Sequence, residues 1–199
     1  MPKKIIIVRH GQTDHNVKKL IQGHLDVKLN ENGKEQAGQI AQELSLEKID
    51  AIFSSDLKRA YDTAVEVAKK HKLTIIQTPS LRERGFGKLQ GVPFLNISDY
   101  FPDQDHITAF SLSEDDSFND KNKYGVETDE QMMERINELD KLLSKYSDKT
   151  VLLVTHGGLV RMLMRHYLGY SAKQVSEIHI PNAKPIVLKK VEGKYVLTI

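Results

Sequence analysis

Arginine and histidine side chains stand directly after three apolar segments of the sequence. Arg9 and His10 follow the first segment, Arg59 lies shortly after the second, and His156 follows the third. The guanidinium group of arginine offers a planar fork of donors that matches phosphate oxygens. Helices that begin just after such segments add free N–H groups, which also bind anions. These residues together predict a site shaped for phosphate that needs no metal.

Each of these residues, taken singly, has a plainer interpretation. Most arginines in folded proteins are solvated or ion-paired, and most histidines are ordinary loop residues. The joint placement favours a site, because Arg9, His10 and His156 all stand at the carboxyl ends of buried strands. Ligands of open parallel sheets bind beyond that edge.

The hydrophobic periodicity supplies the elements that must position these side chains. Continuous apolar runs predict buried strands, and apolar residues at helical spacing predict helices. Strands are expected at residues 4–9, 51–53, 74–78 and 150–155, and a terminal hairpin at 185–199 turning at Glu192 and Gly193. Helices are expected at 31–46, 56–71, 128–146 and 158–168, and residues 10–30 are expected to be a loop with one helical turn.

Strands that alternate with helices predict an α/β fold of three layers, α/β/α, around a mainly parallel sheet. Residues 85–124 interrupt the alternation, because they are polar, weakly periodic and contain Pro93 and Pro102. We interpret that stretch, about 85–124, as a cap inserted into one domain spanning 1–199.

Composition excludes several classes of protein. Apolar residues make up 39% and charged residues 28% of the 199 residues, as in ordinary globular domains. There is no cysteine, so disulfides, thiolate nucleophiles and cysteine-bound metals are excluded. No apolar run approaches the roughly 20 residues that span a bilayer. A cytoplasmic location is therefore expected, without a membrane partner.

The net charge of +2 is too small to indicate a nucleic-acid partner. It is unevenly distributed, since residues 99–123 hold seven acidic and two basic side chains, a net charge of −5. A catalytic metal is also disfavoured. His10 and His15 lack an accompanying carboxylate in a ligand pattern, and Arg9 would repel a cation.

Four blocks of sequence, in order along the chain, resemble the signatures of the histidine phosphatase superfamily, the phosphoglycerate mutase-like enzymes. Gln22-Gly23 and residues 29–33 of this chain resemble the stretch that follows the first block in the same family. The blocks begin with Arg9-His10-Gly11-Gln12-Thr13 and Asn16, and continue with Ser54-Ser55-Asp56-Leu57-Lys58-Arg59-Ala60, Leu81-Arg82-Glu83-Arg84-Gly85-Phe86-Gly87 and Val154-Thr155-His156-Gly157-Gly158.

This resemblance implies a role for each matching residue. His10 is expected to be the nucleophile that becomes phosphorylated, and Glu83 the proton donor. Arg9, Arg59 and His156 are expected to complete the catalytic set and line the phosphate pocket. Further substrate contacts are expected from Asn16, Gln22, Gly23, Ser55 and Gly157. No metal and no other cofactor is expected.

The resemblance implies a phosphatase that hydrolyses small-molecule phosphate monoesters through a phosphohistidine intermediate. The alternative is a 2,3-bisphosphoglycerate-dependent phosphoglycerate mutase, in which a second phosphorylated substrate captures the phosphohistidine. Two departures disfavour the mutase: the acidic stretch at 99–123, and Gly125-Val126-Glu127-Thr128 in place of the family's Gly-Glu-Ser element.

Two further readings remain open beside these. A non-catalytic phosphate-binding module would be expected to lack one of His10, His156 and Glu83, yet all three are present. A secreted acid phosphatase fits poorly with the absence of cysteine. The expected partner is a small phosphorylated metabolite, and the oligomeric state is left open, with a dimer as one option.

Overall fold

The computed structural model describes residues 1–94 and 123–198. The first half contains β1 (Lys4–Arg9), α1 (Asp14–Val17), α2 (Glu31–Glu43), β2 (Ala51–Ser54), α3 (Lys58–His71), β3 (Ile75–Gln77) and the short 3₁₀ turns η1 (Pro79–Leu81) and η2 (Gly87–Leu89). The second half contains α5 (Asp129–Leu143), η4 (Ser144–Tyr146), β4 (Thr150–Thr155), α6 (Gly157–Leu168), α7 (Ala172–Glu177), β5 (Pro185–Val191) and β6 (Lys194–Thr198).

The strands form one sheet in the order β3-β2-β4-β1-β5-β6. The first four of these strands are parallel, and β5 and β6 add an antiparallel edge. β1 and β4 lie side by side in register, so Arg9 pairs with Thr155 at their carboxyl ends. His10 and His156, each one residue further along, therefore emerge next to each other.

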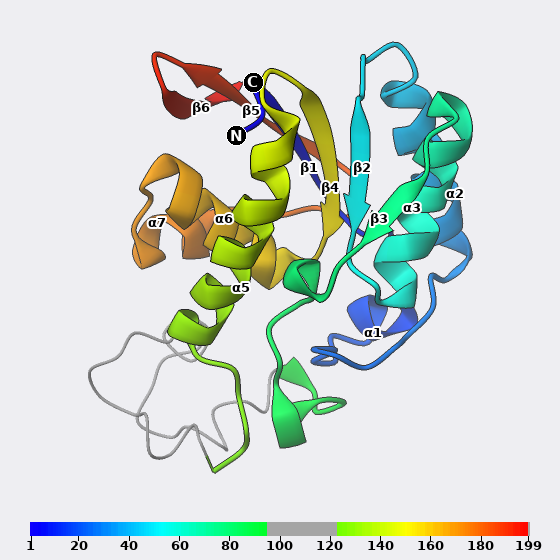
Figure 1. Ribbon diagram of the computed structural model, residues 1–199. Coiled ribbons are helices and arrows are strands. Elements are labelled where there is room, and N and C mark those ends of the chain that lie inside the picture. The colour runs from blue at the N-terminus through cyan, green and yellow to red at the C-terminus, as the bar shows by residue number, and fades with distance from the viewer. Residues whose placement is uncertain (95–122, 199) are drawn as a thin grey trace.

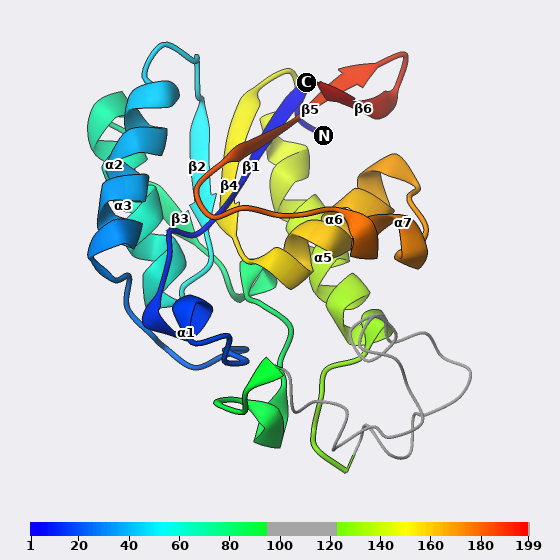
Figure 2. The same cartoon turned by 180° about the vertical axis from the view of Figure 1, so that it is seen from behind.

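A hydrophobic layer lies on each face of the sheet, and successive residues of β1 point alternately into one layer and the other. Ile5 and Ile7 pack on the side of α5 and α6, whereas Ile6 and Val8 pack on the side of α2 and α3. All four side chains are essentially fully buried. Figures 1 and 2 show the two helical layers from opposite directions. The predicted three-layer α/β/α architecture with a mainly parallel sheet is confirmed.

The predicted elements largely coincide with the observed ones, with shorter ends. The segment predicted as helix 31–46 ends at Glu43, and the long helix predicted at 128–146 continues after Leu143 as a 3₁₀ turn. The sequence analysis missed the short helix α7, which Ser171 caps through the N–H of Gln174. Residues 95–122, most of the predicted cap and most of the acidic stretch, lie outside the described residues.

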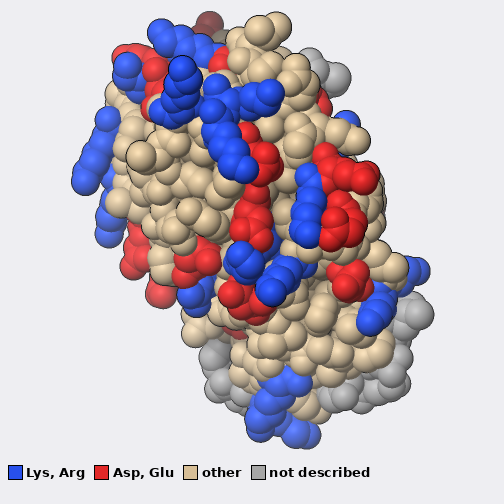
Figure 3. Space-filling view, turned by 90° about the vertical axis from the view of Figure 1, so that its right-hand side faces the viewer, with Lys and Arg blue, Asp and Glu red and all other residues tan. Residues whose placement is uncertain are grey.

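The face formed by α2 and α3 carries acidic and basic side chains interspersed, so neither sign dominates it (Figure 3). Among the residues that the structure describes, no helix is both long and apolar enough to cross a membrane.

Candidate active site

His10 is buried at the end of β1, with only 2% of its surface exposed. Its Nδ1 lies 2.7 Å from the carbonyl oxygen of Gly11. Because a carbonyl can only accept, Nδ1 must carry the proton, which leaves a lone pair on Nε2. The side-chain amide of Asn182 donates a hydrogen bond to the backbone carbonyl of His10, with 2.7 Å between nitrogen and oxygen. The imidazole is therefore fixed in the tautomer that a nucleophile attacking through Nε2 requires.

Two glycines allow the loop after β1 to pass close to the start of α2. A Cβ atom on Gly11 would lie 2.4 Å from the carbonyl oxygen of Gly33, and one on Gly33 would lie 2.0 Å from that of Gln12. Any larger residue at either position would push the backbone apart. This close approach holds the His10 loop against the body of the protein.

Arg59 projects from the first turn of α3 toward His10 and is fully buried. Its Nε lies 3.3 Å from His10 Nε2, and its two Nη groups donate to the carbonyls of Leu25 and Gly23. Burial lowers the pKa of Arg59 to about 10, so the side chain remains a cation near neutral pH. The guanidinium is thus anchored by backbone carbonyls at its far end and presents its charge beside the imidazole.

Three buried nitrogens around His10 have no hydrogen-bond partner among the described residues. They are Arg9 Nε and both ring nitrogens of His156. The rings of His10 and His156 are 5.1 Å apart. Buried donors and acceptors are normally paired, because an unpaired one costs about 1–3 kcal/mol. Their gathering at one point indicates a place for a polyoxygen ligand such as a phosphoryl group.

Both histidines are held neutral by their surroundings. Burial lowers the pKa of His10 well below its ordinary value, and the charges of Arg59 and Arg9 act in the same direction. The pKa of His156 is also far below its ordinary value, through burial first and then through Arg59. A neutral imidazole keeps the lone pair that nucleophilic attack needs.

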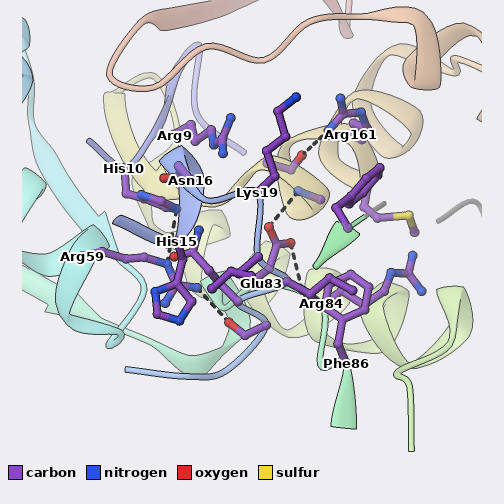
Figure 4. A pocket seen from close by; sticks show the side chains of 18 of the residues that line it. Arg9, His10, His15, Asn16, Lys19, Arg59, Glu83, Arg84, Phe86 and Arg161 are labelled. Carbon is purple, nitrogen blue, oxygen red and sulfur yellow. Dashed lines mark hydrogen bonds between the residues drawn. The ribbon is translucent and has the colours of Figure 1, made fainter. Parts of the chain in front are cut away.

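Glu83 comes from the segment after η1, and its carboxylate lies against the N-terminus of α6, across the cavity from His10 (Figure 4). One carboxylate oxygen accepts from the N–H of Gly158 at 3.0 Å. The other accepts from the N–H groups of Arg84 and Leu159. Free N–H groups at a helix start stabilise an anion. Three backbone N–H groups therefore hold the Glu83 carboxylate in place at the wall of the cavity.

The backbone around Glu83 is held by Arg135 of α5. Arg135 donates to the carbonyls of Glu83 and Arg82 and forms a two-bond ion pair with Glu127. Glu127 in turn accepts from the N–H of Gly85, and His24 donates to the Glu83 carbonyl at 2.7 Å. Side chains from two distant parts of the chain thus fix the segment that carries Glu83.

A cavity of about 500 Å³ joins these groups. The predicted residues that line it are Arg9, His10, Asn16, Gln22, Gly23, Arg59, Glu83 and Gly157. Asn16 and Gln22 are held by Thr13, whose hydroxyl lies 3.1 Å from a side-chain oxygen of each.

Ser55 is placed differently from its predicted role as a contact. It is fully buried, does not line the cavity, and accepts the N–H of Leu57 just before α3. The structure assigns it to the start of the helix that carries Arg59. His156 is fully buried and is not among the lining residues either; its ring is tilted against that of His10.

Several lining residues were missed by the sequence analysis, among them Lys19, Arg84, Phe86 and Arg161. His15, which the sequence analysis considered only as a metal ligand, lines the cavity as well. One feature of the sequence could have suggested that Lys19 lies near the cavity, namely its position three residues after Asn16. Arg161 had a signal too, since it lies one helical turn after Gly157. Neither spacing reveals which way the side chain points.

Metal binding finds no support in the side chains. Within residues 1–94 and 123–198 there is no group of three or more His, Asp or Glu side chains placed to hold a metal ion. Metal independence of the reaction nevertheless stays a prediction.

Comparison with known proteins identifies the family. Residues 5–198 match the histidine phosphatase superfamily (branch 1). Phosphoglycerate mutase-like protein 4 of Arabidopsis thaliana is 38% identical over 88% of this chain and 75% of its own. A broad-specificity phosphatase of Saccharomyces cerevisiae is 33% identical over 95% of this chain and 80% of its own. Mycobacterial glucosyl-3-phosphoglycerate phosphatase, solved with VO₃, superposes with a TM-score of 0.84 at 30% identity, covering 99% and 98% of the two chains.

The chain belongs to the histidine phosphatase superfamily. The family and the phosphatase-type hydrolase predicted from the sequence are confirmed.

The neutral histidines predict a pH-dependent stability. Below about pH 6.5 the unfolded chain protonates His10 and His156, whereas the folded protein resists their protonation. The unfolded state then binds more protons, so the free energy of unfolding should fall as pH falls below 6.5, by at most about 1.4 kcal/mol per pH unit for each histidine. Urea unfolding between pH 5 and 7.5 measures this slope.

The slope should be shallower in His10→Gln and in His156→Gln than in the wild type. His179→Gln, which replaces an exposed histidine, serves as the control and should keep the wild-type slope. Equal slopes in all four proteins would contradict the assignment.

Proposed function

We propose that the protein hydrolyses phosphate monoesters of small molecules in two steps, through a phosphohistidine on His10. The observation that carries the proposal is the convergence of His10 Nε2, the Arg59 guanidinium and the unpartnered nitrogens of Arg9 and His156. Cations and N–H donors offset the negative charge of a phosphate ester, which otherwise repels a nucleophile.

In the first step, the lone pair of His10 Nε2 attacks phosphorus and the ester P–O bond breaks. Protonated Glu83 gives its proton to the leaving alkoxide, so the alcohol departs neutral. Glu83 is left as the carboxylate that the N–H groups of Gly158, Leu159 and Arg84 hold. Arg9, Arg59 and His156 retain the phosphoryl oxygens.

In the second step, Glu83 removes a proton from water, which attacks phosphorus as the P–N bond breaks. Inorganic phosphate leaves, and His10 regains its Nε2 lone pair. Both steps use the same groups on opposite sides of the phosphoryl group, which supports hydrolysis without any added cofactor.

The test is phosphate release from p-nitrophenyl phosphate and from a panel of phosphorylated metabolites, with and without EDTA. We expect hydrolysis that EDTA leaves unchanged, and inhibition by vanadate, which imitates a five-coordinate phosphoryl centre. Loss of activity on chelation, restored by a divalent metal, would overturn the metal-independent mechanism.

Mutase activity is the alternative, and similar proteins named as phosphoglycerate mutases or as mutase-like also exist beside the phosphatases. Incubation with 3-phosphoglycerate and 2,3-bisphosphoglycerate separates the two. We expect phosphate release to exceed formation of 2-phosphoglycerate, and the reverse order would establish the mutase. A cytoplasmic location also stays a proposal, testable by cell fractionation.

A further inference from the structure

A short loop, residues 22–26, joins the two halves of the catalytic site. On one side it contacts the start of α3, which carries Arg59. On the other side it contacts the segment that carries Glu83. The first half is the cation beside the nucleophile, and the second is the predicted proton donor. The loop therefore lies where its contacts can fix the position of one relative to the other.

Three hydrogen bonds attach the loop to the start of α3. The carbonyls of Gly23 and Leu25 accept from the two Nη groups of Arg59, at 2.8 and 2.7 Å. The first N–H of the helix, that of Lys58, donates to the carboxylate of Asp26 at 2.7 Å. The N–H groups at a helix start lack partners within the helix, so this carboxylate acts as a cap from a distant part of the chain. The loop is thus anchored to the element that carries Arg59.

The ring of His24 contacts the other half of the site. Its Nε2 lies 2.7 Å from the backbone carbonyl oxygen of Glu83, and it must carry the proton because a carbonyl can only accept. The backbone N–H of His24 donates to the side chain of Gln90 at 2.6 Å. A Cβ atom on Gly85 would lie 3.5 Å from the ring carbon Cε1, so the half-buried ring packs against that glycine.

The carbonyl that His24 holds belongs to the same peptide group whose N–H holds the Glu83 carboxylate. That N–H, of Arg84, donates to Glu83 Oε1 at 2.9 Å. A peptide group is planar, so its C=O and its N–H turn together. The hydrogen bond from His24 thereby sets the direction of the N–H that orients the carboxylate. His24 is not among the described residues that line the cavity, so it acts on the acid without touching the substrate.

We infer that His24 is a positioning residue, which holds the Glu83 carboxylate in a fixed place relative to Arg59 and thereby supports proton donation to the leaving group. This inference rests on the proposed function, in which Glu83 is the general acid. A general acid must lie within hydrogen-bond reach of the oxygen that it protonates. Displacement of a catalytic group by about 1 Å can cost about 10²-fold in rate.

Other contacts limit the size of the effect. Arg135 also donates to the Glu83 carbonyl, at the longer distance of 3.3 Å. Arg82 forms an ion pair with Asp56, just before α3. Loss of the His24 N–H therefore leaves the segment in place but loosens one peptide group. We expect a loss of about tenfold, which is smaller than full displacement of the acid would cause.

The test measures the rate at which His10 is phosphorylated in a single turnover, by rapid quenching. The substrates are p-nitrophenyl phosphate and an alkyl phosphate from the metabolite panel. His24→Leu, which keeps the bulk and removes the N–H, should lower the rate about tenfold on the alkyl ester and less than about twofold on p-nitrophenyl phosphate, whose leaving group hardly needs a proton. His24→Gln keeps an N–H at a similar reach and should restore most of the rate.

His71→Leu is the matched control. The ring nitrogen of His71 lies 3.1 Å from the backbone carbonyl oxygen of Leu44, and the residue is likewise half-buried. His71 is not among the described residues that line the cavity, so both rates should be unchanged. Inhibition by vanadate should be unchanged in His24→Leu, because backbone carbonyls hold Arg59. Weaker inhibition would assign His24 to phosphate binding and overturn the inference.

A double variant separates positioning from a general effect on the fold. In the background of Glu83→Gln, His24→Leu should cause no further loss on the alkyl ester, because the acid that it positions is absent. Equal losses on the two esters, or a tenfold loss that persists in this background, would contradict the inference. So would an equal loss in His24→Gln and His24→Leu. His24→Asn, with an amide one methylene shorter than that of glutamine, carries the same expectation as His24→Leu and replaces it if leucine prevents folding.

Failure of the proposed function has a different signature. A wild-type protein that hydrolyses no ester, or equal losses on both esters in Glu83→Gln, would refute that function and this inference with it. The expected dependence on the leaving group in Glu83→Gln, without any in His24→Leu, would refute the inference alone.

Discussion

Replacing His10 by alanine is expected to lower kcat for phosphate-ester hydrolysis by about 10⁴-fold or more, since the loss of a nucleophile removes the covalent route. The hydrogen bonds of His10 indicate which ring nitrogen attacks. Nδ1 of His10 is committed to the Gly11 carbonyl, and Nε2 is aimed at the Arg59 guanidinium. Rapid quenching of the wild type after mixing with substrate should also trap an acid-labile phosphate on this residue.

His179→Ala is the control for the loss of a histidine, because His179 is exposed and does not line the cavity. It should retain wild-type turnover and the acid-labile phosphate. Recovery of the phosphate on His156, or near-normal turnover in His10→Ala, would overturn the assignment of the nucleophile.

Replacing Glu83 by glutamine is expected to have the second largest effect, and one that depends on the leaving group. An alkyl alkoxide needs a proton as it departs, whereas p-nitrophenolate largely does not. General acid catalysis contributes about 10²–10⁴-fold. Glu83→Gln should lose most of that on an alkyl phosphate and much less on p-nitrophenyl phosphate, in the pre-steady-state burst that reports transfer to His10.

The burst is the required measurement, because Glu83 also activates water in the second step and steady-state rates would combine the two roles. Glu134→Gln, at an exposed position on α5, is the matched control and should leave both bursts unchanged. Equal losses of burst rate on both substrates would show that Glu83 is not the acid.

Glu127, a second carboxylate next to the segment that carries Glu83, is unsuited to act as the acid in its place. Burial alone would raise the pKa of Glu127, but its hydrogen bonds and ion pair with Arg135 outweigh burial and hold the pKa below its ordinary value. It also does not line the cavity. Its contacts with Arg135 and the N–H of Gly85 make it a support for the segment that carries Glu83.

The sequence alone determined the layered fold and the strand ends at which the histidines stand. A strand buried on both faces needs a continuous apolar run, and a helix that packs on a sheet needs an apolar stripe. The strands β1 and β4 and the helix α3 can therefore be predicted from the pattern of apolar residues alone. In a parallel sheet both strands end at the same edge, which predicts His10 and His156 there; that β1 and β4 are neighbours is seen only in the structure.

Only the tertiary structure decided what each polar side chain contacts. Arg161 and Lys19 enter the cavity, Ser55 turns to the start of α3, and Glu83 lies on the N–H groups of α6. The position of Glu83 depends on hydrogen bonds between segments distant in the sequence, such as those from the N–H of Gly158 and from the side chain of Arg135. Periodicity reports only which face of an element is apolar, so it cannot reveal where a polar side chain points.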